Sequence, residues 1–306
     1  MQNKWKSVRL AGWLALCLFF VAGCTYPSEV TELAKPSSVT GASEQADVAG
    51  ENEATGLNEA AEQTGEETIN AAELLAQAIE VTDTDEEAQS FWYTGYVKNN
   101  IGRRSTTSMY DGIALRPKEA YLVNGRVATR SYQYFHFAGE SYVKRGANWF
   151  EGDPAEQLPF DPVRGFSDWL PFMENAVKLP DSAVLSTPTD VVQVSLSARE
   201  WVEQSPSELF DELRSELDDD ETLQHMLDNT VVKMTLWIGK EDAPKQAHYI
   251  LQYSTWLVMP LPGGGYFDQE TFFRFYQHND PSIEHQLSSP ERLKKYLLTG
   301  DIVQVD

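Results

Sequence analysis

Four side chains near the C-terminus are of types that bind metals and lie close together in the sequence: His278, Asp280, Glu284 and His285. Imidazole and carboxylate groups are common zinc ligands. The two histidines lack the i, i+4 spacing that places two ligands on one helix face, and His-Asn-Asp-Pro is also typical of a strand exit. We therefore predict no metal site in this segment.

Two other short runs have the composition of ligand-binding loops. Residues 218–221 (Asp-Asp-Asp-Glu) carry enough charge for calcium, but they lack the spaced carboxylates, central Gly and terminal Glu of a calcium loop. We expect a solvated junction in which Asp219 or Asp220 caps the following helix. Residues 263–265 (Gly-Gly-Gly) have no following Lys-Ser/Thr and precede a strand, which indicates a turn and not a phosphate-binding loop.

No motif in the chain supplies the reactive groups of a hydrolase or a glycosidase. There is no Gly-x-Ser-x-Gly elbow to seat a nucleophilic serine, and no pair of carboxylates stands out among 47 acidic residues. Five tryptophans have the chemistry to stack on sugar rings, although the core of a sheet is the commoner place for them: Trp92, Trp149, Trp169, Trp237 and Trp256. The sequence therefore predicts a protein that is not an enzyme and needs no cofactor.

Residues 1–24 have the layout of a secretory signal. Lys4, Lys6 and Arg9 precede the apolar run of residues 10–21, which is too short to span a bilayer as a helix. The run leads into Val-Ala-Gly-Cys, which ends at Cys24 and resembles the lipobox of bacterial lipoproteins. The resemblance implies a signal peptide of residues 1–23, acylation of the Cys24 sulfur and attachment to the membrane through the acyl chains. The alternative is an ordinary secretory peptide with a coincidental cysteine.

The only other cysteine, Cys17, lies in the segment that such cleavage removes. A mature chain that starts at Cys24 would have no free thiol and no disulfide, which excludes thiol catalysis and cysteine-based zinc sites. We predict an extracytoplasmic protein that is lipid-anchored to the cell membrane.

Residues 24–70 form an acidic linker by composition. Residues 25–70 include ten acidic residues, one basic residue and one aromatic residue, and such a segment cannot bury enough apolar area to fold. We predict a disordered tether with an end-to-end distance of about 35–40 Å. The net charge of −23 argues further against a nucleic-acid partner.

Residues 71–306 contain 30 of the 35 aromatic residues, which is enough for one substantial core. A helix over residues 71–79 is predicted first, with Leu74, Leu75, Ala78 and Ile79 on one stripe. Strands are predicted next over residues 91–98, 121–123, 126–129, 131–137, 140–144 and 148–151. Asn-Gly at residues 124–125 is a preferred two-residue hairpin turn, so it predicts a reversal there.

The second half of this region mixes both periodicities. Four helices are predicted. The first covers residues 162–173 and is capped by Asp161, and the second runs from a capping box at residues 205–208 to residue 217. The third lies around residues 223–227, and the fourth covers residues 290–298. Alternation of apolar and polar residues predicts strands over residues 192–198, 232–238, 245–258 and 266–277. This order of elements indicates an α+β fold with a mostly antiparallel sheet.

Three segments carry a resemblance to a known fold: residues 90–95 (Ser-Phe-Trp-Tyr-Thr-Gly), residues 141–149 (Ser-Tyr-Val-Lys-Arg-Gly-Ala-Asn-Trp) and residues 235–244 (Thr-Leu-Trp-Ile-Gly-Lys-Glu-Asp-Ala-Pro). The succession over residues 71–298 resembles the LolA-like and LppX-like lipoproteins, and sensor domains of the RseB kind share it. The resemblance implies a curved, mostly antiparallel half-barrel whose concave side is covered by helices. It also implies a module that binds an acyl chain, another apolar ligand or a partner protein, without chemistry.

A lipoprotein carrier must shuttle freely, whereas Cys24 implies an anchored chain, so the resemblance favours a fixed receptor, chaperone or sensor. We predict a binding module for an apolar or lipid-like ligand, with its site between the sheet and the helices over residues 162–173 and 205–217. The candidate lining residues, each also suited to the core, are Phe166, Trp169, Val194, Leu196, Met234 and Leu236. The alternative is an envelope sensor or regulator that acts through protein–protein contacts. A wall-associated enzyme with an unrecognised site is a third, weaker hypothesis.

Overall fold

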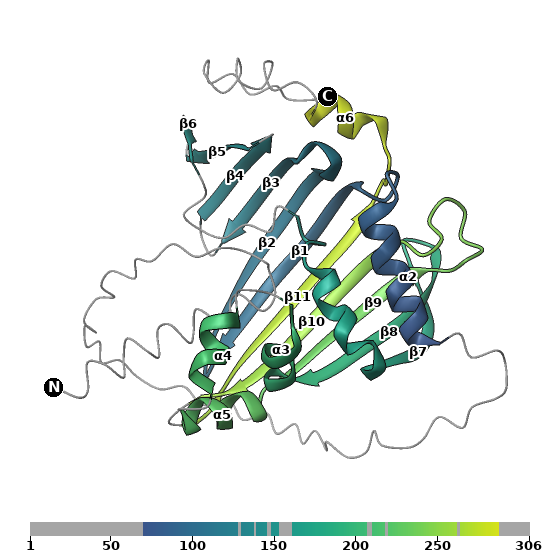
Figure 1. The fold of residues 1–306 in the computed structure, drawn as a ribbon. Coiled ribbons are helices and arrows are strands. Elements are labelled where there is room, and N and C mark those ends of the chain that lie inside the picture. Colours follow the sequence, from purple (N-terminus) through teal and green to yellow (C-terminus); the bar gives the residue numbers. More distant parts are fainter. Residues whose placement is uncertain are drawn as a thin grey trace, which may run out of the picture. The chain divides into compact units, whose positions relative to one another are not determined.

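One antiparallel sheet of eleven strands organises the structure. The computed structural model describes residues 70–127, 130–137, 139–145, 148–152, 161–206, 210–217, 220–261 and 264–287. The strand order is β6-β5-β4-β3-β2-β1-β11-β10-β9-β8-β7, so that β1 and β11 meet within the sheet (Figure 1). The strands are β1 (Ser90–Ile101), β2 (Arg104–Leu115), β3 (Ala120–Val127), β4 (Arg130–Phe137), β5 (Glu140–Arg145), β6 (Asn148–Glu151), β7 (Ala176–Val184), β8 (Thr187–Ser197), β9 (Val231–Gly239), β10 (Ile250–Pro260) and β11 (Tyr266–Tyr276).

Helices pack on both faces of this sheet. On one face, which we call the inner face, lie α2 (Ala71–Thr84), the 3-10 helix η2 (Phe166–Asn175) and α3 (Ala198–Gln204) (Figure 1). Two short helices, α4 (Asp211–Leu217) and α5 (Glu221–Asp228), follow α3 and contact it. On the opposite, outer face α6 (Pro281–Leu287) packs against β1, β2 and β3. The predicted α+β fold with a mostly antiparallel sheet is confirmed.

The main core lies between the inner face and its helices. Side chains alternate between the two faces of a strand, so the even-numbered residues of β8 and β9 that point inward are buried together: Val192, Val194, Leu196, Val232, Met234, Leu236 and Ile238. Helix α2 adds the predicted stripe of Leu74, Leu75, Ala78 and Ile79, all of them buried. Its N-terminus is capped by Asn70, whose side chain accepts a hydrogen bond from the backbone N–H of Ala72.

Gly112 permits close packing within the sheet. A Cβ at Gly112 on β2 would overlap the ring of Tyr93, which lies across from it on β1 and is fully buried. Only a residue without a side chain therefore fits beneath that ring.

Two strands of the sheet are absent from the sequence prediction. Strand β2 begins with exposed polar residues and becomes apolar only in its second half, while β7 is exposed along most of its length and contains Pro180. Strand β7 is the last strand of the sheet, and edge strands tolerate proline and need no buried face.

The predicted hairpin turn at Asn124 and Gly125 is wrong. Strand β3 runs straight through both residues, which pair with Asp111 and Tyr110 on β2 and with Gln133 and Tyr132 on β4. Asn-Gly permits the positive φ angles of a turn without requiring them, and here neighbours on both sides hold the two residues extended.

The predicted helix over residues 162–173 starts later and is a 3-10 helix. Turns occupy residues 162–165, and η2 begins at Phe166 after Gly165, whose φ is 86°. Pro171 lies within η2, where it removes one backbone donor. Asp161 is not the predicted helix cap, because η2 begins five residues later and Gly165 occupies its N-cap position; the Asp161 carboxyl pairs with the guanidinium of Arg116.

Two further element boundaries differ from the prediction. The backbone N–H of Ser205 donates to the Trp201 carbonyl and ends α3, a helix absent from the prediction. Of the helix predicted from residue 205 to residue 217, the structure describes α4, while residues 207–209 lie outside the described ranges. The strand predicted to begin at residue 245 begins at Ile250, since Lys245 and His248 have positive φ angles that belong to turns. Helix α6 is also absent from the prediction.

The described residues of the acidic run 218–221 and of the glycine run 263–265 have the structural roles predicted for them. The Asp220 carboxylate caps α5 by accepting hydrogen bonds from the backbone N–H groups of Thr222 and Leu223 at 3.0 and 3.1 Å. Gly264 and Gly265 have φ angles of 98° and 88° in the turn before β11, where only glycine adopts them freely.

Some predictions concern residues outside the described ranges. These are the signal peptide of residues 1–23, Cys24, the linker up to residue 69, the cap at Asp219 and the helix over residues 290–298. Within the described part of the chain, no helix is both long and apolar enough to cross a membrane.

Candidate ligand-binding site

All six predicted lining residues lie in the main core. Val194 and Leu196 come from β8 and Met234 and Leu236 from β9, and Val194 pairs directly with Met234 across the two strands. Phe166 and Trp169, from η2, belong to the same cluster, and all six side chains are buried, with exposed fractions of 5% or less. The structure therefore brings together every residue that the sequence indicated.

The layer above these strands is aromatic. The Trp169 ring meets the Trp201 ring of α3 edge-on, with centroids 4.0 Å apart. The Phe172 ring stacks on the Trp201 ring, with centroids 5.3 Å apart. The rings of Phe166 and Tyr253, on β10, form a T-shaped pair with centroids 5.0 Å apart. Helix η2 is thus held to α3 and to the sheet by ring contacts.

Trp201, Phe172 and Tyr253 were not among the predicted site residues. One signal for Trp201 is present in the sequence: Ser197 and Glu200 form a capping box, and Ala198, Trp201 and Val202 then follow at helical spacing. Nothing local in the sequence shows that Phe166 and Tyr253, 87 positions apart, meet.

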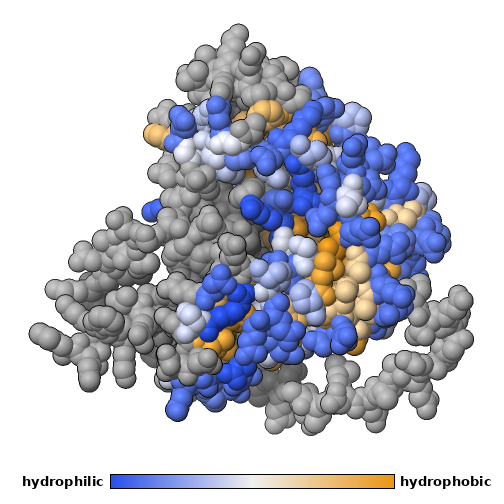
Figure 2. Space-filling model, viewed as in Figure 1, coloured by the Kyte–Doolittle hydropathy of each residue, from blue (hydrophilic) through white to orange (hydrophobic). Residues whose placement is uncertain are grey.

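The inner face also presents apolar residues at the surface. In the view of Figure 2, orange side chains gather over α2 and are surrounded by hydrophilic ones. Neither this helix nor η2 is polar all round, as expected for segments that cover an apolar sheet face.

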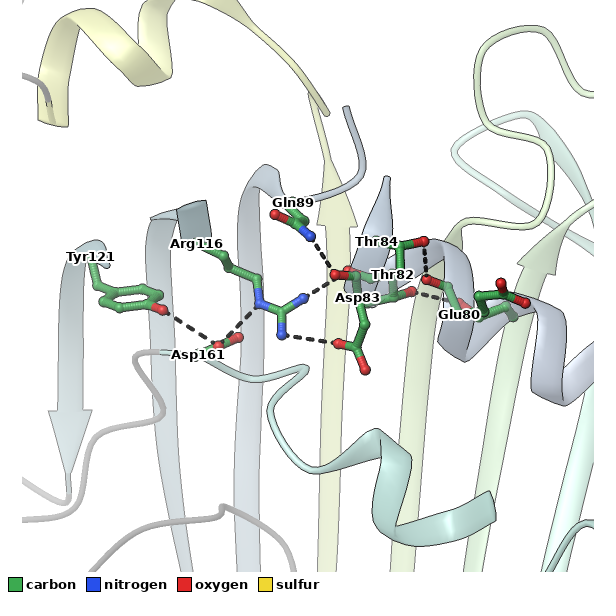
Figure 3. A network of polar contacts seen from close by, with 9 residues as sticks. Glu80, Thr82, Asp83, Thr84, Gln89, Arg116, Tyr121 and Asp161 are labelled. Atoms are coloured by element: carbon green, nitrogen blue, oxygen red, sulfur yellow. Dashed lines mark hydrogen bonds and ion pairs between the residues drawn. The ribbon is translucent and has the colours of Figure 1, made fainter. Parts of the chain in front are cut away.

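A buried ionic network fixes the end of α2 to the segment that leads into η2 (Figure 3). The Arg116 guanidinium donates from Nη1 to the Thr82 carbonyl at 2.7 Å, from Nη2 to Asp83 Oδ1 at 3.1 Å and from Nε to Asp161 Oδ2 at 3.2 Å. The Tyr121 hydroxyl donates to the same Asp161 oxygen at 3.5 Å. Arg116 therefore connects three separate parts of the chain.

Burial dominates the electrostatics of this network. It raises the pKa of Asp161 above its usual value, although Arg116 pulls that pKa down. Burial alone would lower the pKa of Arg116, but the carboxylates of Asp161 and Asp83 raise it. Burial and the charge of Asp161 together raise the pKa of Tyr121. These directions describe a structural tie and not a pair of groups that exchange protons near neutral pH.

The four candidate metal ligands near the C-terminus have separate roles. The Asp280 carboxylate accepts from the backbone N–H of Ser282 at 2.8 Å, and Glu284 pairs with Lys118. His278 packs edge-on against Tyr249, and burial lowers its pKa to about 4. His285 is exposed on α6. In the described ranges no three His, Cys, Asp or Glu side chains are placed to hold a metal ion.

The tryptophans divide between the core and the outer face. Trp169 is a core residue, Trp92 and Trp237 are half-buried, and Trp256 is 44% exposed, with Lys233 Nζ 5.5 Å from its ring centroid. The side chain of Trp149 lies outside the described residues.

Comparisons with known proteins return similarities of structure. No protein-family model and no curated protein matches the chain. The crystal structure of LprF from Mycobacterium bovis is similar, with 16% identity and a TM-score of 0.40 over 69% of this chain and 93% of that one. The lipoprotein LppX of Mycobacterium tuberculosis shares 9% identity and a TM-score of 0.38, over 69% and 96% of the two chains.

A LolA superfamily protein from Nitrosomonas europaea is similar at 10% identity and a TM-score of 0.25, over 68% of this chain and 92% of that one. The resemblance to LolA-like and LppX-like proteins is thereby confirmed as a structural similarity. It concerns the fold alone.

Proposed function

We propose that this chain is an extracytoplasmic lipoprotein whose folded domain, residues 71–306, binds an apolar or lipid-like ligand without catalysing a reaction. The observation that carries the proposal is the aromatic layer of Trp169, Phe172 and Trp201 over the apolar strands β8 and β9. In this proposal the acyl chain lies between η2 and the sheet, against Phe166, Trp169, Val194, Leu196, Met234 and Leu236.

The construction of η2 supports its role as a displaceable cover. A 3-10 helix has poorer hydrogen bonds than an α-helix, and η2 also contains Pro171. It is ten residues long, and its ring contacts can be exchanged for contacts with an equally apolar chain. Burial of each CH₂ contributes roughly 0.8 kcal/mol, so eight carbons contribute on the order of 6 kcal/mol before the costs of binding.

The proposal includes a curved, half-barrel sheet. An open, twisted sheet of more than about ten strands curls or splits, and this sheet has eleven. Curvature toward the inner face provides room beneath helices that a flat sheet lacks.

The proposed anchor is Cys24, with residues 1–23 removed and residues 24–70 acting as a disordered tether. The support is the order of charged residues, apolar run, small residues and cysteine in the sequence. Replacing Cys24 by Ala should move the protein from the detergent phase to the aqueous phase in a phase-partition assay. A variant that partitions like the parent protein would contradict lipidation.

Limited proteolysis tests the tether. Cleavage should occur within residues 24–70 and stop near α2, because exposed segments without a core are cut first. A linker that resists cleavage along its whole length would show that the proposed domain division is wrong.

Ligand binding is tested with a brominated fatty acid, which quenches tryptophan fluorescence at short range. Native mass spectrometry of residues 25–306 made in cells should first show co-purified lipid. After delipidation, titration should quench fluorescence saturably, and the W169F/W201F variant should lose most of the quenching. Trp256→Phe is the matched control, because Trp256 lies exposed on the outer face, so its removal should leave the quenching curve unchanged.

The absence of both lipid and saturable quenching would remove this proposal. The envelope sensor or regulator that acts through protein contacts would then be the leading hypothesis.

A further inference from the structure

A second site lies on the outer face, away from the helices that cover the core. A concave surface with a volume of about 550 Å³ is formed by β2, β3, β4 and β5, and its lining includes Met109, Asp111, Asn124, Arg126, Gln133 and Lys144. This volume is within the range of sites for small ligands. None of the six residues proposed for the apolar ligand contributes to it.

Strand register places the side chains that line this concave surface in two rows. Asp111 pairs with Asn124, Asn124 with Gln133 and Gln133 with Lys144, so these four side chains cross four adjacent strands in one line. With neighbouring strands about 4.8 Å apart, the row is about 14 Å long. Two positions along each strand, and about 7 Å away, a second row contains Met109, Arg126 and Ser131.

Hydrogen bonding sets the orientation of the two amides. Gln133 Nε2 donates to Asn124 Oδ1 at 2.9 Å. The Asn124 nitrogen and the Gln133 carbonyl oxygen are thus left for other partners, as one donor and one acceptor side by side. Such pairing of donors and acceptors matches hydroxyl groups, which act as both.

The charged groups add directional partners of both signs. No ion pair to Asp111 or Arg126 occurs within the described part of the chain, although the two side chains lie on neighbouring strands. A carboxylate accepts from two adjacent hydroxyls, and a guanidinium donates through a planar fork. Together they suit a vicinal diol.

Apolar surface borders this polar area. Met109 is 57% exposed, and across the strands it pairs with Tyr96, which stacks on Phe272 with ring centroids 5.4 Å apart. One row of the outer face thus runs from an aromatic pair through Met109 to Arg126. Sugar rings have the same combination of an apolar C–H face and a polar rim.

We propose that this concave surface, which we call the outer-face site, binds a short, uncharged oligosaccharide. The net charge of −23 opposes a polyanion, and the presence of Asp111 beside Arg126 removes the single-sign lining that an anion would need. The density of amide, carboxylate and guanidinium groups is unsuited to an acyl chain, because each group would lose its hydration without a partner. The proposal does not depend on the one made for the inner face.

The test uses the full chain, purified in a detergent without a sugar head group. Maltotetraose, cellotetraose and tetra-N-acetylchitotetraose are titrated separately and followed by calorimetry. At least one should bind saturably, with a dissociation constant of about 1 mM or lower. Arg126→Ala and Asp111→Asn should each weaken that binding about tenfold or more, since each removes charged hydrogen bonds.

Ser195→Ala is the control, because Ser195 is exposed on the outer face of β8, beyond the outer-face site. All variants should unfold at the same temperature as the parent protein, which separates loss of binding from loss of fold. The proposal is overturned if none of the three sugars binds up to about 10 mM, or if both site variants bind as the parent does. Tighter binding of dextran sulfate than of any neutral sugar would also overturn it.

Discussion

Replacing Arg116 by alanine removes the cation from the buried network between α2 and the segment before η2. The Asp161 side chain is 7% exposed and lies 3.2 Å from the guanidinium. The variant therefore leaves a buried carboxylate without the charge that compensates it, the situation in which removal of one partner is most costly.

The expected loss at neutral pH is about 3–5 kcal/mol in the free energy of unfolding. For a domain of this size the unfolding midpoint should fall by about 10 °C. Part of the loss must depend on pH. Burial already raises the pKa of Asp161 in the folded protein, and loss of Arg116 raises it further.

The sign of this dependence follows from proton linkage. A carboxyl with a raised folded pKa binds a proton in the folded state before it does so in the unfolded state, so acidification stabilises the variant. The difference between the parent protein and Arg116→Ala should therefore shrink as pH falls toward about 4. About 1 kcal/mol should persist there, because the contacts of Arg116 with Thr82 and Asp83 are lost at every pH.

Urea denaturation at pH 7 and pH 4.5, followed by circular dichroism, measures both quantities. In the double variant R116A/D161N the carboxylate is absent, so it should be more stable at pH 7 than Arg116→Ala alone. Lys118→Ala is the control, since the pair of Lys118 with Glu284 is exposed and its removal should leave the midpoint unchanged within error. A loss in Arg116→Ala that is equal at both pH values, and is not relieved by Asp161→Asn, would refute the reasoning.

Two further predictions concern other buried positions. Gly112→Ala should lower the free energy of unfolding by about 1–3 kcal/mol, because its methyl group overlaps the Tyr93 ring. Urea denaturation should show no such loss for Ser108→Ala on the same strand. The pKa of His278 is lowered to about 4, so the unfolded state takes up a proton between about pH 6.5 and pH 4 that the folded state refuses, and stability falls by up to about 3 kcal/mol across that window. His278→Asn should flatten this part of the stability profile, and an unchanged slope would contradict the assignment.

Strands with one buried and one exposed face could be predicted from the sequence because their alternation is local. Strands β8, β9 and β11 bury every second residue over most of their length. The predicted bounds of β9 and β11 agree with the structure to within one residue at each end, while the prediction for β8 lacks its first five residues. Strand β7 was missed because an edge strand with little buried surface carries no such pattern. Patterning thus finds strands by their burial and not by their hydrogen bonds.

Local signals for turns were weaker guides. Asn124 and Gly125 have the composition of a turn but lie inside β3. The pairing of β3 with β2 on one side and β4 on the other outweighs this local preference. The competing contacts come from other strands, so no short window of the sequence reveals them.

The candidate site could be predicted in part for the same reason. Val194, Leu196, Met234 and Leu236 are inward positions of alternating strands, and the alternation alone identifies them. Their aromatic cover depends on the meeting of η2 with α3, and the Arg116–Asp161 pair joins residues 45 positions apart. Contacts of this kind are set by how the elements pack, which one sequence without relatives does not contain.

The same alternation makes the two proposed sites separable by mutation. On β3, Val123 is fully buried on the inner face, while its neighbour Asn124 is exposed on the outer face. A shift of register by one residue would exchange them, and the pairing of β3 with β2 and β4 over its whole length prevents that shift. Arg126→Ala should therefore leave fatty-acid quenching intact, and W169F/W201F should leave sugar binding intact. If either variant abolished both activities, a single shared structural defect would explain the losses better than two sites on opposite faces of one sheet.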